Sequence, residues 1–508
     1  MFSITAVLIC AVQVDARTSS PATIYLDSTE QVIRGFGAAN ILPWRPDMTS
    51  GEIQKAFGTA EGQLGFSILR LRIPLQENEY SQNLATAQAA HSMGAKIIAS
   101  PWSPPAHMKS NNSTIGGRLS ENSYDDYAAH LKSFADYMAD NGVPLYAISV
   151  QNEPDVEVSY ESCDWNAEEM TRFLKENAES IGVPVIAPES YNFNKTISNL
   201  ILNDSIAAAH LSIVGGHLYG GGLDPYPLAW EKGKELWMTE HLDTDISWSA
   251  VLGTGKEIHD CMVSGMNAYI WWYIVRFYGP IHDGEDWQGD DIEDNSEKGE
   301  ITKRGNIMSQ YSRFIRPGYI RVNASVEPRA QVYVSAYTTD STIVIVAINT
   351  GDSSQEQTFT LDGGSASYFS RYVTSERKNA EQVTDITVSG GSFTATLDKE
   401  SVTTFVSEDR VTGVTESSKV PKTFHLSQNY PNPFNPETTI EFMLNQDRDV
   451  TLVVYNSLGR QVAQLANGKY SAGQHKVTFH AFDLPSGIYF YKMMAGGHTQ
   501  MKKLVLLK

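Results

Sequence analysis

The feature that most constrains this chain is a regular alternation, between residues 33 and 276, of eight short apolar runs with longer amphipathic segments. Short apolar runs are typical of buried strands, and the segments between them are long enough for helices. Strands that alternate with helices predict a parallel sheet, and eight such units predict a (β/α)8 TIM barrel. The predicted strands are Ile33–Ala39, Ser67–Pro74, Lys96–Pro101, Leu145–Pro154, Pro184–Glu189, Ile213–Tyr219, Glu235–Glu240 and Ala268–Arg276.

Two of the intervening segments have clear helical patterns. Tyr124–Met138 places its apolar side chains on one stripe. Asn166–Ile181 begins with a residue that can cap a helix, and Glu169 stands at the reciprocal capping position. We therefore expect one helix over each range.

Beyond the barrel, which we assign to residues 17–316, the pattern becomes β-rich. Residues 317–406 alternate apolar runs with Gly, Ser and Asp turns, which predicts an antiparallel side β-sandwich. Residues 407–423 are polar and lack periodicity, so we expect a linker. Residues 424–508 form a second β-rich unit. The predicted fold class is therefore α/β, with a TIM barrel and two β domains.

The first sixteen residues, Met1–Ala16, resemble a secretory signal. Phe2–Val12 is an apolar run, and Val14-Asp15-Ala16 has the small residues of a cleavage site. The segment lacks a Lys or Arg before the apolar run, which leaves a buried N-terminal strand as the alternative. No other stretch of the sequence approaches the ~20 apolar residues of a membrane span.

The net charge argues against nucleic acid as a partner, and the Cys and His spacing argues against a zinc site. The net charge of −20 argues against nucleic acid, because binding phosphates needs clustered Lys and Arg. A neutral or weakly acidic polysaccharide remains compatible with this charge. Cys163 and Cys261 would remain after signal removal, and the sequence leaves open whether they form a disulfide or two free thiols. No Cys/His spacing resembles a zinc site, so we expect no metal or cofactor.

Glu153 and Glu240 each stand at the carboxyl end of a predicted strand. Glu153 follows Ile148–Asn152, and Glu240 ends Leu236–Thr239. The carboxyl ends of parallel barrel strands face one cleft, so the two carboxylates can flank one bond. Paired carboxylates are what hydrolysis of a glycosidic bond requires. A salt bridge or a cap at a strand end is the structural alternative for each residue alone.

Polar and aromatic residues at other strand ends are candidates for sugar binding. Asn152 stands beside Glu153, and His217 and Tyr219 share parity at the end of the sixth predicted strand. Tyr219 can donate a hydrogen bond that keeps Glu240 ionised. Trp102 lies in a Pro-rich loop where its indole can form a sugar platform, or can pack under the loop.

Trp272, Arg276 and Tyr278 also share parity, after the eighth predicted strand. A guanidinium flanked by aromatic side chains is suited to a bidentate grip on a carboxylate, which indicates a substrate with an acidic branch. A structural ion pair is the alternative.

An acidic segment follows these residues. Asp283–Glu300 holds nine Asp and Glu residues and one Lys. Its spacing does not match a calcium-binding loop. We expect a solvated surface loop.

At these residues the sequence resembles glycoside hydrolase family 30, and within it the bacterial glucuronoxylanases. The resemblance covers roughly residues 23–407. Its motifs are Arg34-Gly35-Phe36-Gly37-Ala38, Leu69-Arg70-Leu71-Arg72-Ile73-Pro74, Ala99-Ser100-Pro101-Trp102-Ser103-Pro104-Pro105, Gln151-Asn152-Glu153-Pro154, Tyr160-Glu161-Ser162-Cys163, His217-Leu218-Tyr219-Gly220, Met238-Thr239-Glu240-His241 and Trp271-Trp272-Tyr273. The family fold is a TIM barrel with an attached side β-sandwich, to which we expect residues 23–30 to contribute.

The resemblance implies a secreted retaining endo-β-1,4-xylanase that cuts glucuronoxylan near its (methyl)glucuronic acid branches. Glu240 matches the nucleophile and Glu153 the acid/base, which implies a raised pKa for Glu153 in the free enzyme. The two carboxyl groups are expected about 5–5.5 Å apart. Trp272, Arg276 and Tyr278 match positions that contact the uronic acid.

Two positions depart from the family pattern. Leu242 stands where the family typically has Tyr, and Asp245 where it has Ser. Both family residues touch the uronic acid, and an Asp beside that carboxylate would repel it. Strict dependence on the branch is therefore open.

Residues 424–508 resemble the C-terminal sorting domain of type IX secretion substrates. The matching strings are Leu426-Ser427-Gln428-Asn429-Tyr430-Pro431-Asn432-Pro433-Phe434-Asn435-Pro436 and Leu484-Pro485-Ser486-Gly487-Ile488-Tyr489. This implies an Ig-like β-sandwich, recognition by the type IX machinery, and a secreted or cell-surface protein of a Gram-negative bacterium. We expect the protein to be a monomer. A carbohydrate-binding module is the alternative for this domain.

Two other functions remain open for the whole chain. One is a different family 30 hydrolase, acting on unbranched xylan, a β-glucan, a fucoside or a glucoside. The other is a surface protein that binds glycans without cutting them, which the presence of both carboxylates disfavours.

Overall fold

The computed structural model describes residues 20–285, 296–408 and 411–412 and, with short gaps, residues 425–506. The predicted signal Met1–Ala16, most of the predicted linker and the middle of the acidic segment lie outside the described residues. The chain divides into two units, Met1–Gly413 and Val414–Lys508.

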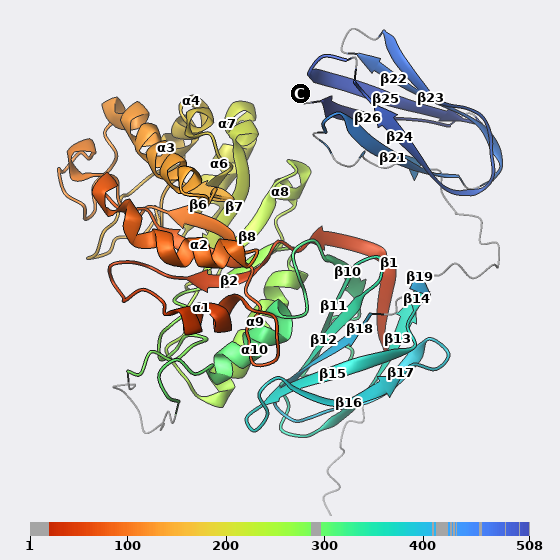
Figure 1. The fold of residues 1–508 in the computed structure, drawn as a ribbon, viewed down its shortest axis with the longest axis horizontal. Coiled ribbons are helices and arrows are strands. Elements are labelled where there is room, and N and C mark those ends of the chain that lie inside the picture. Colours follow the sequence, from red (N-terminus) through yellow and green to blue (C-terminus); the bar gives the residue numbers. More distant parts are fainter. Residues whose placement is uncertain are drawn as a thin grey trace, which may run out of the picture. The chain divides into compact units, whose positions relative to one another are not determined.

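Eight parallel strands form a closed barrel in the first unit (Figure 1). Each predicted apolar run overlaps one of them, and β9 pairs with β2 to close the barrel. The strands are β2 (Gly35–Ala39), β3 (Ile68–Arg72), β4 (Lys96–Ser100), β5 (Ala147–Ser149), β6 (Val185–Ser190), β7 (Leu211–His217), β8 (Glu235–Glu240) and β9 (Ala268–Trp271). Strands enclosed on both faces need continuous apolar runs, which is why the pattern was visible in the sequence.

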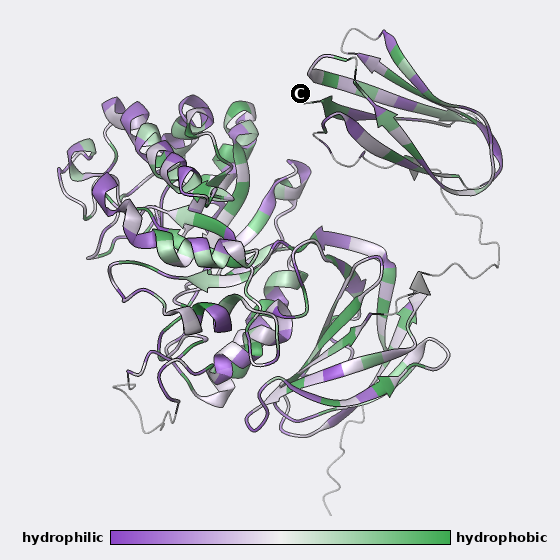
Figure 2. Cartoon of the chain, viewed as in Figure 1, coloured by the Kyte–Doolittle hydropathy of each residue, from purple (hydrophilic) through white to green (hydrophobic). Residues whose placement is uncertain are grey.

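Side chains from β3 to β9 meet in a compact apolar cluster that includes Ile98, Ile213 and Trp237. A larger cluster joins the strands to the surrounding helices. In Figure 2 the apolar residues of the barrel strands contrast with the polar outer faces of the helices. This rigid scaffold fixes the strand ends, where the candidate residues lie.

Helices lie around the barrel (Figure 1). They are α1 (Ser50–Phe57), α2 (Leu84–Ser92), α3 (Tyr124–Asp140), α4 (Ala167–Glu176), α5 (Ala178–Ile181), α6 (Lys195–Asn203), α7 (Ser205–His210), α8 (Pro227–Glu231), α9 (Trp248–Val263) and α10 (Lys303–Ser312), with 3-10 turns η1 (Glu77–Asn83), η2 (Ala106–Met108) and η3 (Glu121–Ser123).

The helix predicted over Asn166–Ile181 is two helices. Its start is as predicted, because Asn166 and Glu169 form a reciprocal capping box. The break occurs at Asn177, whose φ of −124° is not helical. The buried Asn177 side chain donates a hydrogen bond to Asp125 Oδ1 at 2.5 Å, which holds the chain in this bend. The prediction of one helix was therefore wrong.

The side β domain is built on a nine-stranded sheet in the order β16-β15-β18-β12-β11-β10-β1-β13-β17. Its inner residues form a separate apolar cluster that includes Phe359, Phe393 and Phe405. Helices α9 and α10 pack against this sheet as well as against the barrel. The strands are β1 (Ala22–Val32), β10 (Ile320–Ala324), β11 (Val332–Thr338), β12 (Ile343–Asn349), β13 (Gln355–Asp362), β15 (Tyr368–Ser375), β16 (Glu381–Thr387), β17 (Ser392–Leu397) and β18 (Ser401–Ser407), beside the short pair β14 (Gly364–Ser365) and β19 (Val411–Thr412).

The second unit has two small antiparallel sheets around its own apolar core. One has the order β20-β21-β24 and the other β23-β22-β25-β26. The strands are β20 (His425–Leu426), β21 (Glu437–Leu444), β22 (Arg448–Asn456), β23 (Gln461–Tyr470), β24 (Gly473–His480), β25 (Gly487–Ala495) and β26 (His498–Leu506). The predicted fold class is confirmed.

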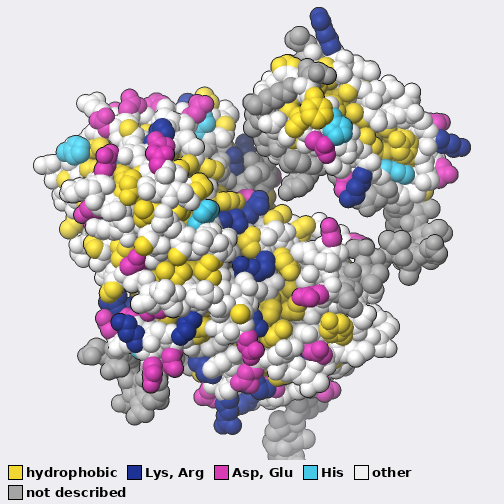
Figure 3. All heavy atoms as spheres, in the orientation of Figure 1, with side chains coloured by type: hydrophobic (Ala, Val, Ile, Leu, Met, Phe, Trp, Pro, Cys, Tyr) yellow, Lys and Arg dark blue, Asp and Glu magenta, His cyan; other side chains and the backbone are white. Residues whose placement is uncertain are grey.

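Across the described part of the chain, no helix has the length and apolarity needed to cross a membrane. Figure 3 shows acidic and basic side chains interspersed over the visible face. Cys163 and Cys261 are both buried, and both are free thiols.

Candidate active site

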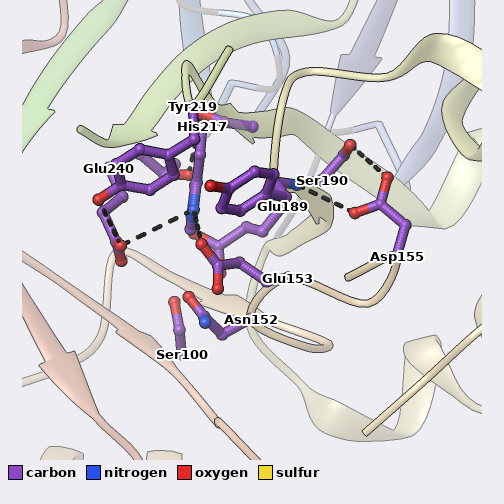
Figure 4. A network of polar contacts seen from close by, with 12 residues as sticks. Ser100, Asn152, Glu153, Asp155, Glu189, Ser190, His217, Tyr219 and Glu240 are labelled. Carbon is purple, nitrogen blue, oxygen red and sulfur yellow. Dashed lines mark hydrogen bonds and ion pairs between the residues drawn. The ribbon is translucent and has the colours of Figure 1, made fainter. Parts of the chain in front are cut away.

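Carboxylates and a histidine meet where β5 to β8 end (Figure 4). Glu153 follows β5, Glu189 is near the end of β6, His217 ends β7 and Glu240 ends β8. All four side chains are buried. The barrel topology brings these residues together from distant parts of the sequence, as strand-end positions in this fold do.

The backbone is strained at two of these carboxylates. Glu153 has φ of 49° and Glu189 has φ of 56°, in the left-handed region that non-glycine residues rarely occupy. The N–H of Glu153 donates to the carbonyl of Glu189 at 3.1 Å, so the two bends support each other. Strain of this kind persists only where the surroundings over-determine the conformation, and it is frequent at active sites.

His217 lies between Glu153 and Glu240. Its Nδ1 is 3.0 Å from Glu153 Oε1 and 3.9 Å from Glu240 Oε1. One oxygen of each carboxylate and a ring nitrogen of His217 all lie within 4.8 Å of one another. Carboxyl groups about 5–5.5 Å apart are typical of retaining glycosidases, whereas inverting enzymes need roughly 6.5–9.5 Å to admit a water.

Arg70, in β3, also contacts this group and is not among the residues predicted from the sequence. It is fully buried, and its Nη1 donates to Glu240 Oε2 at 2.5 Å while its Nη2 donates to Asn152 Oδ1 at 2.7 Å. Nη2 also lies 3.4 Å from Glu189 Oε1. An arginine inside an apolar strand is unusual, and that signal in Leu69-Arg70-Leu71 could have identified it.

Two tyrosines hold the paired carboxylates. Tyr219 donates to Glu240 Oε1 at 3.0 Å, as the sequence predicted, and Tyr160 donates to Glu153 Oε2 at 2.8 Å. Tyr160 is 45% exposed, so it lies at the mouth of the site. It belongs to a motif that we had noted without a role, and its loop position gave no periodic signal.

The pKa values of the two carboxylates are shifted in opposite directions. Burial and the neighbouring charge of Glu153 raise the pKa of Glu240 above its ordinary value, although His217 and Arg70 act in the opposite direction. Burial also tends to raise the pKa of Glu153, but hydrogen bonds from His217 and Tyr160 outweigh this effect and lower it. The predicted raised pKa of Glu153 is therefore wrong for this arrangement.

His217 lies in an environment that favours its protonated form. Burial alone would lower the pKa of His217, but the charges of Glu240 and Glu153 raise it above its ordinary value. A proton on Nδ1 points at the Glu153 carboxylate at hydrogen-bond distance. The His217–Glu153 pair can therefore hold a proton beside the cleft.

The buried third carboxylate, Glu189, offsets the charge of Arg70. Burial would raise the pKa of Glu189, but the charges of Arg70 and His217 lower it. Arg70 thus lies among three carboxylates, and Glu189 helps to fix it in place.

Glu153, His217 and Glu240 are also close enough together to hold a metal ion. Each oxygen of the two carboxylates already faces a donor from Arg70, Tyr219, Tyr160 or His217. A cation would have to replace these hydrogen bonds and approach the Arg70 guanidinium. The donor set therefore suits acid–base and nucleophilic chemistry better than metal binding.

Aromatic side chains line one side of the site. Trp102 is only 3% exposed, because it packs against Trp44, Trp272 and the Arg70 guanidinium. Its predicted role as an open sugar platform stays a proposal, and packing accounts for its position. The open indole is that of Trp44, which is 38% exposed and which we had not identified.

The predicted strand that would carry Trp272, Arg276 and Tyr278 is shorter than expected, so strand parity does not set the direction of these side chains. Strand β9 ends at Trp271 rather than at Arg276. A tight turn follows, in which the N–H of Gly279 donates to the carbonyl of Arg276 at 2.8 Å. Trp272 packs on Trp102 and is hydrogen-bonded to Tyr278, and the Arg276 guanidinium lies 5.8 Å from the Tyr278 ring centroid. The three side chains are therefore still neighbours, and their contact with a substrate stays a prediction.

Carboxylates of the chain itself already contact Arg276. Its Nη1 lies 2.7 Å from Asp283 Oδ2 and also contacts Glu285. These residues begin the acidic segment, so this part of the segment is ion-paired rather than simply solvated. The structural ion pair that we had considered as the alternative is thus present.

The two family departures also have structural positions. Leu242 packs against the main apolar cluster. Asp245 is exposed, and its Oδ1 accepts a hydrogen bond from the N–H of Ser247 at 2.8 Å, just before α9.

Two family descriptions match the chain. Residues 55–219 match the glycosyl hydrolase family 30 TIM-barrel domain. Residues 428–507 match the secretion system C-terminal sorting domain. The protein is therefore secreted or displayed at the surface of a Gram-negative cell.

Relatives and solved structures cover nearly all of the first unit. Glucuronoxylanase XynC of Bacillus subtilis is 43% identical over 420 residues, which are 80% of this chain and 96% of that protein. A glycoside hydrolase family 30 subfamily 8 xylanase from Clostridium acetobutylicum superposes with a TM-score of 0.71 at 39% identity, covering 76% of this chain and 99% of that one. A GH30 endoxylanase from Clostridium papyrosolvens gives a TM-score of 0.69 at 42% identity, with 77% and 100% covered.

Proposed function

The chain belongs to glycoside hydrolase family 30, and we propose that it is an exported endo-β-1,4-xylanase that hydrolyses glucuronoxylan with retention. The observation that carries this proposal is the pair Glu153 and Glu240, whose nearest oxygens lie within 4.8 Å with His217 between them. That spacing suits double displacement, because an attacking carboxylate needs no intervening water.

In the first step Glu240 attacks the anomeric carbon and Glu153 protonates the departing oxygen. Arg70 and Tyr219 hold the Glu240 carboxylate by two hydrogen bonds and so orient it. One C–O bond forms to Glu240 while the glycosidic C–O bond breaks, and the proton leaves with the sugar alcohol. Fixed orientation of this kind removes much of the entropic cost of the encounter.

We propose that His217 stores the proton that Glu153 delivers. In the free enzyme the ionised form of Glu153 is stabilised, and the raised pKa of His217 keeps a proton 3.0 Å away. As the leaving oxygen gains negative charge, the proton moves from Nδ1 through Glu153. The pair thus acts as one general acid.

In the second step Glu153 removes a proton from water, which attacks the covalent intermediate and releases Glu240. Once Glu240 is esterified, its negative charge is gone. The pKa of His217, which that charge raises in the free enzyme, is then lowered. After Glu240 is released, His217 can take up the proton from Glu153, which restores the starting state. Retention follows from two successive inversions at the same carbon.

Sugar contacts are assigned to residues around the pair. Asn152 accepts a hydrogen bond from Arg70, which supports the proposal that it contacts a hydroxyl of the sugar that Glu240 attacks. Trp102 and Trp272 form the aromatic wall of the site, and Trp44 presents its open face farther out. We expect a monomer, because one chain supplies every residue of this site.

A second candidate function is a xylanase that does not depend on the uronic acid. The ion pairs of Arg276 with Asp283 and Glu285 favour it, since Arg276 was expected to hold the uronate. The two functions share the same catalytic pair and differ only in substrate choice.

The test is a product profile on glucuronoxylan and on linear arabinoxylan. If the protein is a xylanase, it should release short oligosaccharides from glucuronoxylan. The Glu240→Gln variant should release none. Products that all carry a uronic acid one unit from the reducing end support cutting at the branch. Equal cleavage of both polymers supports the second candidate, and no release of oligosaccharides from either would contradict the xylanase proposal.

A further inference from the structure

Two arginines from separate loops converge on the same pair of carboxylates. Asp283 Oδ2 accepts from Arg45 Nη2 at 2.5 Å and from Arg276 Nη1 at 2.7 Å. Glu285 Oε2 lies 3.0 Å from Arg45 Nη2 and also contacts Arg276. The four side chains therefore form a closed cluster whose formal charge is zero.

Three of the four side chains in this cluster are largely shielded from solvent. The side chains of Arg45 and Arg276 are 22% and 21% exposed, and that of Asp283 is 11% exposed. Ion pairs that lose most of their water are held more firmly than surface pairs, provided that each charge is matched. Glu285 is 56% exposed and contributes less.

The cluster lies beside the aromatic wall of the active site. Arg45 follows Trp44, whose ring centroid is 5.3 Å from that of Trp102. The Arg70 guanidinium lies over the Trp102 ring, 4.9 Å from its centroid, and donates a hydrogen bond to Glu240. A hollow of about 480 Å³ adjoins Arg45, and it is lined by Leu42, Pro43, Trp44, Arg45, Pro46 and Gln82.

An acidic sugar that reached these guanidinium groups would have to displace a carboxylate that is already bound. Asp283 belongs to the same chain as both arginines, so its effective concentration at the cluster is high. The two positive charges of Arg45 and Arg276 are also neutralised by Asp283 and Glu285, so the cluster as a whole does not attract an anion. Xylan without acidic branches meets no such barrier, since it binds by stacking and hydrogen bonds.

We propose that Asp283 and Glu285 are specificity-determining residues that occupy the place of a substrate carboxylate at Arg45 and Arg276. The enzyme therefore accepts xylan chains without requiring a uronic acid branch. This inference rests on the proposed xylanase function and refines its substrate class. It also gives a role to the first part of the acidic segment.

The experiment compares kcat/KM on glucuronoxylan and on linear arabinoxylan. For the full-length protein we expect the two values to agree within about threefold. In the double variant Asp283→Asn, Glu285→Gln, the arginines lose their matching charges but keep neighbours of the same shape. The ratio of glucuronoxylan to arabinoxylan activity should then rise about tenfold, which corresponds to about 1.4 kcal/mol.

Three further variants isolate the cause. Glu297→Gln removes an exposed carboxylate of the same segment and should leave the ratio unchanged. Glu285→Gln alone, at a more exposed position, should give part of the gain with little effect on thermal unfolding. Adding Arg276→Ala to the double variant should abolish the gain.

An unchanged ratio in a folded, active double variant would overturn the inference while leaving the xylanase proposal intact. The same holds if the unmodified protein releases only products that carry a uronic acid. If no variant hydrolyses either xylan, the proposed function itself is overturned, and the inference with it.

Discussion

Replacing His217 with Gln tests how the acid proton is held. His217 Nδ1 is 3.0 Å from Glu153, and its pKa is raised above the ordinary 6.5. In the variant Glu153 must carry the proton itself, and the ordinary pKa of its carboxyl group is 4.5. The variant will therefore lose the proton at a lower pH than the unmodified enzyme does, because a carboxyl group replaces an imidazole whose pKa is raised.

The sign of this shift follows from which state is active. The enzyme needs the proton on the His217–Glu153 pair, so activity is present below the pKa of the pair and is lost as pH rises through it. Removing the member with the raised pKa moves the basic limb of kcat/KM toward acid pH. The acid limb, which reports ionisation of Glu240, should move upward, because the His217 charge that lowers the pKa of Glu240 is gone.

The assay is the pH dependence of kcat/KM on xylan oligosaccharides and on an aryl xylobioside with an acidic phenol leaving group. The aryl substrate needs little protonation, so His217→Gln should reduce its hydrolysis much less. His259→Gln is a matched control, because His259 is also a buried histidine but packs on Tyr333 in the side domain. A basic limb that stays in place in His217→Gln would refute the role of His217 as proton store.

Two further substitutions test the groups that orient Glu240. Arg70→Lys keeps a positive charge but cannot hold Glu240 and Asn152 together, so we expect kcat to fall by roughly 10²–10³-fold. Urea denaturation should also show a loss of about 3 kcal/mol, because buried Glu189 loses part of its ion pair. Tyr219→Phe removes one hydrogen bond to Glu240, which should cost about 1.5–3 kcal/mol in kcat/KM and move the acid limb upward. Tyr226→Phe, in which a tyrosine away from the site loses its hydroxyl, should leave both readouts unchanged.

The barrel could be predicted from the sequence because its constraint is periodic. Strands that are buried on both faces require unbroken apolar runs, so all eight were visible. The division of the helix at Asn177 was not visible, because it depends on a contact with Asp125 from another helix. The turn after Trp271 was missed for a similar reason, since aromatic residues continue beyond the end of the strand.

The sequence could predict those residues of the site that stand at the carboxyl ends of predicted strands. Glu153, His217, Tyr219 and Glu240 follow from position along the strands, and the structure brings them together. Arg70 and Glu189 were missed although each left a signal, which is an arginine inside an apolar strand for Arg70 and a carboxylate at a predicted strand end for Glu189. The partners of Arg276 could not be predicted, because ion pairing between loops leaves no local pattern.

The most direct test of the central claim is covalent trapping of the intermediate. A 2-deoxy-2-fluoro xylobioside with an activated leaving group slows both steps, and the second more than the first, so the glycosyl-enzyme accumulates. Peptide mapping by mass spectrometry should find the added fluoro-xylobiosyl mass on Glu240 and on no other residue. An adduct on Glu153, or turnover without any adduct and with the α-anomer formed first, would contradict the account.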